Sequence, residues 1–238
     1  MLTLVEDFKR CLADLADPEK AQIYQRFFKT GKGEYGEGDI FLGITVPQQR
    51  LVAKEFYLKL NLDEIQELLN SEIHEHRLTS VLMLVLRYEK SKDDSSKQSI
   101  VQFYIQNAKN FNNWDLVDSG CYKILGHHCF HQHKEEILFA LAKSENLWEK
   151  RISVVSTQYF IKQKSLDIPL ELILQNLHHP HELMHKANGW MLRELGKIDE
   201  DKLTDFLDIY TTQLPRTTLR YAIERLGPTL RKYYLELK

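Results

Sequence analysis

The 238-residue sequence contains few of the residues that end regular structure or cross-link it, with ten glycines, six prolines and three cysteines. The cysteines, Cys11, Cys121 and Cys129, are odd in number and form no CxxC pair, which argues against a disulfide framework and against a cysteine zinc site. No apolar run approaches the ~20 residues of a membrane span, and the first residues do not have the pattern of a signal peptide. We therefore expect a soluble, cytoplasmic protein that does not bind membranes.

An excess of one charge is also lacking: the sequence has 32 Lys and Arg residues and 34 Asp and Glu residues, for a formal net charge of −2. This balance excludes a globally basic nucleic-acid binder. Any interaction with DNA must depend on a local patch of cations.

Apolar residues recur at helical spacing along nearly the whole chain, so we expect helices almost throughout. Asp17 and Pro18 have the pattern of an N-cap and first helical residue. One long irregular connection is expected over Thr30–Ile44, which holds five of the ten glycines. Its GKG does not match a phosphate-binding loop, because Gly33 stands where Ser or Thr is needed. The predicted helices are 2–16, 18–29, 47–59, 62–70, 73–90, 95–109, 114–126, 133–143, 147–162, 169–177, 181–197, 200–212, 215–226 and 228–236.

Three of these segments align with one another, each placing a cation before an apolar stripe, at Arg77, Arg151 and Lys186. The gaps are 74 and 35 residues, and half of the first gap leads to Trp114. A period of this length, with one helical pair per unit, is typical of HEAT-type repeats. We therefore predict an all-α HEAT-like helical repeat solenoid over residues 1–238, a single domain with a concave DNA-binding face.

Trp114 and Asp118 stand four residues apart, which places an indole and a carboxylate on one face of a helix. Trp190 and Arg193 are three apart and also share a face. If Arg151 joins them in the concave face, a carboxylate lies among two indoles and two guanidiniums. Such a group suits a sugar that becomes positively charged beside a phosphate, as in the loss of an alkylated purine.

The chain resembles the AlkD family of bacterial DNA alkylation repair glycosylases over nearly its whole length. The motifs that carry the resemblance are FLGI at 41–44 followed by Pro47, NWDLVDS at 113–119, NLWEKR at 146–151 and GWMLRE at 189–194. The resemblance implies base excision repair of N3- or N7-alkylated purines in duplex DNA, with no metal or nucleotide cofactor, by a protein that we expect to be a monomer.

The resemblance further implies that Asp118 is the catalytic carboxylate, that Trp114 and Trp190 contact the lesion nucleotide, and that Arg151 holds the backbone beside it. The remaining residues that we expect to contact DNA are Arg193, Lys186, Phe27 and Lys150. The chain departs from the family at Glu182 and Leu183, where members carry two aromatic residues.

Two alternatives stay open at this point. A protein with the same fold could bind damaged or branched DNA without cleaving it. HELMH at 181–185 matches the HExxH pattern of zinc hydrolases, with Glu194 as a candidate third ligand, and GHHCFHQH at 126–133 gathers four histidines near a helix end.

Overall fold

The computed structural model describes residues 3–237. In that part of the chain the regular structure is helical, and the β-type contact is an isolated parallel bridge between Ile40 and Ile73. This confirms the all-α class. The contacts divide the chain into two compact units, Met1–Gly120 and Cys121–Lys238.

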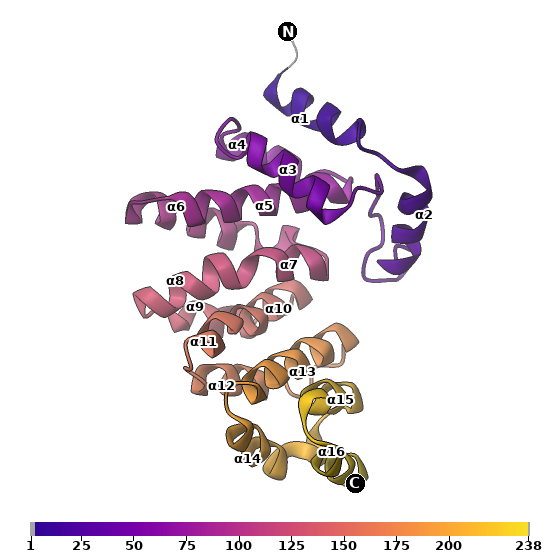
Figure 1. Cartoon of the computed structure of the whole chain (residues 1–238). Coiled ribbons are helices and arrows are strands. Elements are labelled where there is room, and N and C mark those ends of the chain that lie inside the picture. The colour runs from indigo at the N-terminus through magenta and orange to yellow at the C-terminus, as the bar shows by residue number, and fades with distance from the viewer. Residues whose placement is uncertain (1–2, 238) are drawn as a thin grey trace. The chain divides into compact units, whose positions relative to one another are not determined.

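Several helices of the first unit begin at polar N-cap residues. The Asp17 side chain accepts a hydrogen bond from the Lys20 N–H, and Pro18 is the first residue of its helix, as predicted. Asn61 and Glu64 form a reciprocal capping box at the start of another helix. In chain order (Figure 1) the helices are α1 Leu4–Ala13, α2 Pro18–Phe27, α3 Val46–Phe56, α4 Leu62–Leu69, α5 His74–Lys90, α6 Asp94–Gln106, a 3₁₀ turn at Ala108–Asn110, and α7 Trp114–Cys121.

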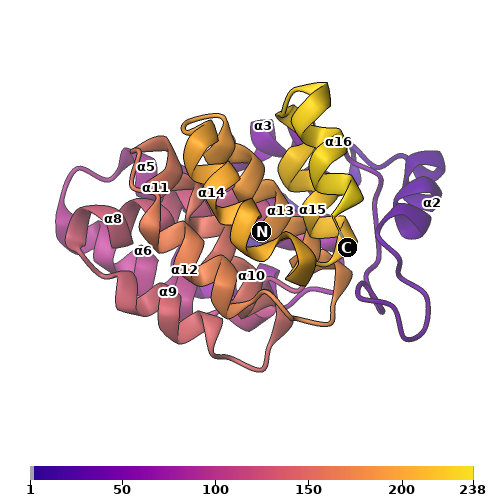
Figure 2. The same cartoon turned by 90° about the horizontal axis from the view of Figure 1, so that it is seen from below.

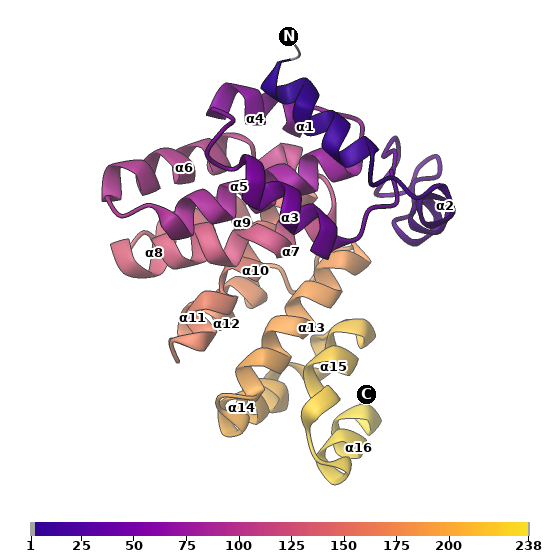
Figure 3. The same cartoon turned by 45° about the horizontal axis from the view of Figure 1, so that its top comes forward.

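Helix α5 is the centre of the first unit. Every residue from His74 to Val85 is buried, on all sides of the helix, because α1, α3, α4 and α6 pack against it. Figure 3 shows α1 and α3 crossing beside α5. A helix buried all round is normally apolar throughout, yet α5 begins with the buried polar run His74, Glu75, His76 and Arg77. Three of them, His74, Glu75 and Arg77, contribute to the candidate functional site of this unit.

The glycine-rich connection between α2 and α3 is tied to the start of α5, as expected for an ordered segment. The carboxylate of Glu75 accepts hydrogen bonds from the backbone N–H groups of Leu42, Gly43 and Ile44, at 2.9, 2.8 and 3.2 Å. Ile40 accepts a further bond from the backbone of His74. The buried carboxylate of Glu75 therefore holds the connection in place by accepting hydrogen bonds from its backbone N–H groups.

The second unit contains the remaining helices. Its α13 packs closely on α15, side by side in Figure 2. Gly189 permits this approach, since a Cβ there would lie 2.6 Å from the Thr218 carbonyl oxygen. The elements are a π-helical turn at Tyr122–Gly126, α8 His127–Gln132, α9 Glu135–Ala142, α10 Leu147–Ser156, α11 Gln158–Lys162, α12 Asp167–Gln175, α13 Glu182–Gly196, α14 Glu200–Tyr210, a 3₁₀ turn at Thr211–Gln213, α15 Arg216–Ala222, a 3₁₀ turn at Ile223–Arg225, and α16 Pro228–Glu236.

The helices predicted over 95–109, 200–212 and 215–226 end in 3₁₀ turns, and two other predicted helices differ more from the observed ones. The helix expected to end at Gly126 continues through the π-helical turn into α8, and ends where His133 adopts a left-handed conformation with φ of 51°. The helix expected over 147–162 is divided at Thr157, whose hydroxyl donates to the Val154 carbonyl at 2.6 Å. Among the described residues, no helix is both long and apolar enough to cross a membrane.

Candidate functional site

Trp114 and Asp118 lie one turn apart on α7, and both side chains are partly exposed. Both side chains therefore reach the surface of the first unit from the same helix. Phe27, at the end of α2, is 62% exposed and meets the Trp114 indole edge to face, with 6.0 Å between ring centroids. The structure thus brings together three of the residues that the sequence singled out.

Behind Trp114 lies a cluster of three rings, formed by Phe28, Phe41 and His74. The centroids of Phe28 and Phe41 are 4.9 Å apart, and those of Phe41 and His74 are 4.4 Å apart. Trp114 stacks on Phe28 at 5.2 Å with an interplanar angle of 13°. Stacked aromatic pairs add stabilisation beyond the area that they bury, so one face of the indole is held and the orientation of the ring is restricted.

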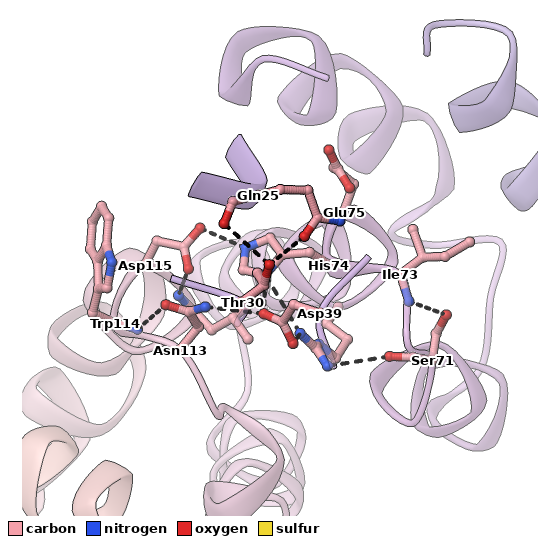
Figure 4. A network of polar contacts seen from close by, with 12 residues as sticks. Gln25, Thr30, Asp39, Ser71, Ile73, His74, Glu75, Asn113, Trp114 and Asp115 are labelled. Atoms are coloured by element: carbon pink, nitrogen blue, oxygen red, sulfur yellow. Dashed lines mark hydrogen bonds and ion pairs between the residues drawn. The ribbon is translucent and has the colours of Figure 1, made fainter. Parts of the chain in front are cut away.

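His74 also forms the middle of a buried ion network (Figure 4). Its Nδ1 lies 3.0 Å from a carboxylate oxygen of Asp39, and its Nε2 lies 2.8 Å from a carboxylate oxygen of Asp115. Asp39 also accepts hydrogen bonds from Arg77, at 2.5 Å, and from the side-chain amide of Asn113, at 3.0 Å. All five side chains are buried, and the network joins the glycine-rich connection, α5 and the start of α7.

The network is electrically balanced, with two carboxylates, a guanidinium and an imidazolium. Burial alone would lower the pKa of His74, but Asp115 and Asp39 outweigh it and raise that pKa to about 9. Burial likewise opposes ionisation of Asp39, yet His74 and Arg77 lower the pKa of that carboxyl below its usual value. Both ring nitrogens of His74 face carboxylate oxygens, and only the doubly protonated ring can donate to both.

A cavity of about 300 Å³ adjoins this network in the first unit. Its walls are apolar side chains of α2, the glycine-rich connection and α5, while His74, Glu75 and Asp115 supply polar surface. Phe27 lies at this cavity as well as against Trp114. An apolar hollow with a few fixed polar groups is the usual form of a ligand site.

The remaining expected site residues lie in the second unit. Arg151 on α10 is 4% exposed, and its Nη1 donates to the backbone carbonyl of Leu183 at 2.5 Å. Leu183 itself is buried in the first turn of α13. The guanidinium therefore supports the start of the helix that carries Trp190, which is partly exposed. The contact of Arg151 with a DNA backbone stays a prediction.

Two of the cations expected to contact phosphate are paired with acids of the same unit. Lys186 lies 2.9 Å from Glu182, one of the positions where the chain departs from the family that it resembles. Arg193 lies 2.5 Å from Glu224 and 3.5 Å from Glu194. Lys150, on α10, is half-buried. Phosphate would have to compete with these carboxylates for Lys186 and Arg193.

The HELMH segment has a local structural role. His181 is the N-cap of α13, with its Nδ1 accepting from the Leu183 N–H at 3.1 Å. The Nε2 of His185 bonds to the carbonyl of His179 at 2.6 Å. Residues 3–237 contain no group of three or more His, Cys, Asp or Glu side chains that could hold a metal ion, and this includes the histidines of 126–133.

Reasoning from the sequence did not find His74, Asp39 and Asp115 as parts of the site. The available signal was the run of polar residues His74–Arg77 at the start of an otherwise apolar helix. Polar residues in a first helical turn are usually solvated, so the pattern did not stand out. Asp39 comes from an irregular segment, and periodicity makes no prediction there.

The fold is that of an all-α helical repeat protein. Its first unit presents the Trp114 indole and the Asp118 carboxylate at the surface, next to the buried network of Asp39, His74 and Asp115. The chain belongs to the DNA alkylation repair enzyme family, whose model matches residues 8–226. Membership gives the protein a role in the repair of alkylated DNA, and with it DNA binding.

A solved structure described as a predicted DNA alkylation repair enzyme from Enterococcus faecalis has the same fold, with a TM-score of 0.69. It is 16% identical, and the match covers 90% of this chain and 97% of that one. No curated protein matches this chain.

Proposed function

We propose that the protein is a monofunctional DNA glycosylase that hydrolyses the N-glycosidic bond of N3- or N7-alkylated purines in duplex DNA, as a step of base excision repair. Alkylation at these nitrogens gives the purine a positive charge, so the base leaves as a neutral molecule. A neutral leaving group needs no general acid. The enzyme must instead stabilise a sugar that gains positive charge and orient one water molecule.

Asp118 is the carboxylate that we assign to this task. Its side chain reaches the surface one turn from Trp114 on the same helix, and this juxtaposition is the observation on which the proposal rests. A carboxylate beside an indole face favours a cation placed between them. Trp114, with Phe27 at its edge, would contact the lesion nucleotide. The roles expected of Trp190 and Arg151 stay predictions.

The test is the release of methylated purine from alkylated duplex DNA, measured under single-turnover conditions. We expect the wild type to release base without added metal or nucleotide. Asp118→Asn should lower the rate by about 10²–10³-fold, the usual cost of losing one group that stabilises charge in a transition state. Asp63→Asn is the matched control, because it removes the same charge from an exposed position on α4.

The outcomes separate the role of Asp118 from the activity itself. Release by the wild type that Asp118→Asn leaves unchanged contradicts the role of this carboxylate. DNA binding by the wild type without any release supports the alternative, a non-catalytic protein that recognises damaged or branched DNA on the same fold.

A further inference from the structure

His74 differs from an ordinary buried histidine in that both ring nitrogens face carboxylates, Asp39 on one side and Asp115 on the other. It is 2% exposed, so its charge is almost entirely removed from bulk water. Burying ions is costly, and apolar residues of similar volume often stabilise a fold at least as well. A buried network of this kind therefore points to a role in fixing one geometry.

The geometry that the network fixes is the start of α7. Asp115 is the second residue of that helix, and Asn113 is the residue immediately before the helix. The Asn113 side chain accepts from the Trp114 N–H at 2.9 Å through its oxygen and donates to Asp39 through its nitrogen. Both residues that flank Trp114 in the chain are thus bound to the network (Figure 4).

His74 reaches Trp114 by a second route, through aromatic rings. Its imidazole lies 5.1 Å from Phe28, and Phe28 in turn stacks on the indole of Trp114. The backbone of Trp114 is therefore held from one side and its ring from the other, and both connections begin at His74. Asp118 follows one turn later on the same short helix, so its direction depends on the same start.

We propose that His74 is a positioning residue of the DNA site: held between Asp39 and Asp115 and packed on Phe28, it sets the orientation of Trp114 and, through α7, of Asp118. The consequence for base release rests on the proposed function. The orientation of Trp114 does not depend on the proposed function, and it can be measured without DNA.

Substitution with 5-fluorotryptophan gives one ¹⁹F probe for each of the three tryptophans of the chain, Trp114, Trp148 and Trp190. Tryptophan-to-phenylalanine variants assign the signals. His74→Gln removes the cation and at least one of the two hydrogen bonds, so the Trp114 resonance should shift or broaden while the Trp148 and Trp190 resonances stay in place.

His76→Gln is the matched control. His76 is buried two residues further along α5, but its ring meets Ser71, at 2.9 Å, and Phe8, instead of Asp39, Asp115 and Phe28. Its loss should leave the Trp114 resonance unchanged. If His74→Gln does not fold, Asp115→Asn tests the same link with a smaller change. A folded variant of either kind with a wild-type Trp114 resonance overturns the proposal.

The kinetic measurement separates positioning from general damage. In His74→Gln the single-turnover rate of base release should fall about 10- to 100-fold, the effect of a small misplacement of reacting groups, while the Kd for alkylated duplex DNA changes less than about twofold. His74→Arg, whose planar guanidinium can donate to both carboxylates, should recover part of the rate.

A wild-type rate in folded His74→Gln overturns the catalytic part of the proposal. If the wild type releases no base at all, the proposed function fails, whereas the ¹⁹F measurement still decides whether His74 positions Trp114.

Discussion

His74 and His76 lie two residues apart on α5, both buried, and their surroundings shift their pKa values in opposite directions. The carboxylates of Asp39 and Asp115 raise the pKa of His74 to about 9 against the effect of burial. Burial, with a smaller effect of Lys9, lowers the pKa of His76 to about 4. One helical turn therefore contains an imidazole that stays charged and another that stays neutral at the same pH.

This relationship predicts a maximum of stability near pH 6.5, the ordinary pKa of histidine. Above it the folded protein keeps the His74 proton that the unfolded chain has lost, so the free energy of unfolding falls as pH rises toward 9. Below it the unfolded chain protonates His76 while the folded protein does not, so stability falls as pH drops toward 4. Each decline amounts to about 3–4 kcal/mol at most.

Urea denaturation across pH 4–9 measures both declines, and the variants assign them. His74→Gln should remove most of the alkaline decline and His76→Gln most of the acid one. Parallel pH profiles for the two variants would contradict the assignment.

A second prediction concerns the paired cations of the second unit. Glu182→Gln removes the acid paired with Lys186, and Glu224→Gln removes the nearer of the two acids beside Arg193, so each should strengthen binding to duplex DNA, by severalfold at low salt. Stability should change by less than about 0.5 kcal/mol, because exposed ion pairs contribute little. Fluorescence anisotropy at several salt concentrations measures the affinity and its salt dependence. We expect the wild-type slope to indicate few phosphate contacts, and each freed cation that reaches a phosphate to increase it by about one unit.

Glu171→Gln, on α12, is a control that removes a negative charge from an exposed side chain that forms no ion pair in the described part of the chain. If it strengthens binding as much as the two test substitutions, the effect comes from net charge and not from the release of Lys186 or Arg193.

Arg151→Ala should weaken DNA binding and also destabilise the protein. The substitution leaves the buried carbonyl of Leu183 without the Arg151 donor, at a cost of about 1–3 kcal/mol. Arg151→Lys retains the charge but not the planar guanidinium, so it should bind DNA with intermediate affinity. Wild-type affinity in both folded variants would limit Arg151 to its support of α13.

Metal removal tests the zinc hydrolase alternative. We expect dialysis against a chelator to leave base release and the folded state unchanged, and His185→Ala to retain activity on alkylated DNA. Stoichiometric zinc in the purified protein, lost on His185→Ala together with activity, would instead establish the HELMH segment as a metal site.

Periodicity predicted the fold well, because most helices have a clear apolar stripe and ordinary caps. It failed at Gly126, where a glycine normally marks a helix end. Here the backbone continues, and glycine is needed because a Cβ would lie 2.2 Å from the carbonyl oxygen of Ser156. That packing contact brings together residues thirty positions apart, so no local pattern could show it.

The candidate site likewise has a part that the sequence predicted and a part that it did not. The spacing of Trp114 and Asp118 was sufficient to predict a shared face, since both lie on one helix. The contact of Phe28 with Trp114 and the link from Asp39 through His74 to Asp115 join segments far apart in the chain. Their formation depends on tertiary packing, which spacing along one helix does not report.

The balanced charges at the start of α5 also constrain how this sequence can diverge. Two carboxylates and two cations are buried together, so replacing any one of Asp39, His74, Arg77 or Asp115 leaves a charge without its counterpart. A single step of that kind should be strongly selected against. In related proteins we expect these four positions to change jointly, so that an acidic residue is replaced together with a basic one. We expect this even where the surface around Trp114 varies freely.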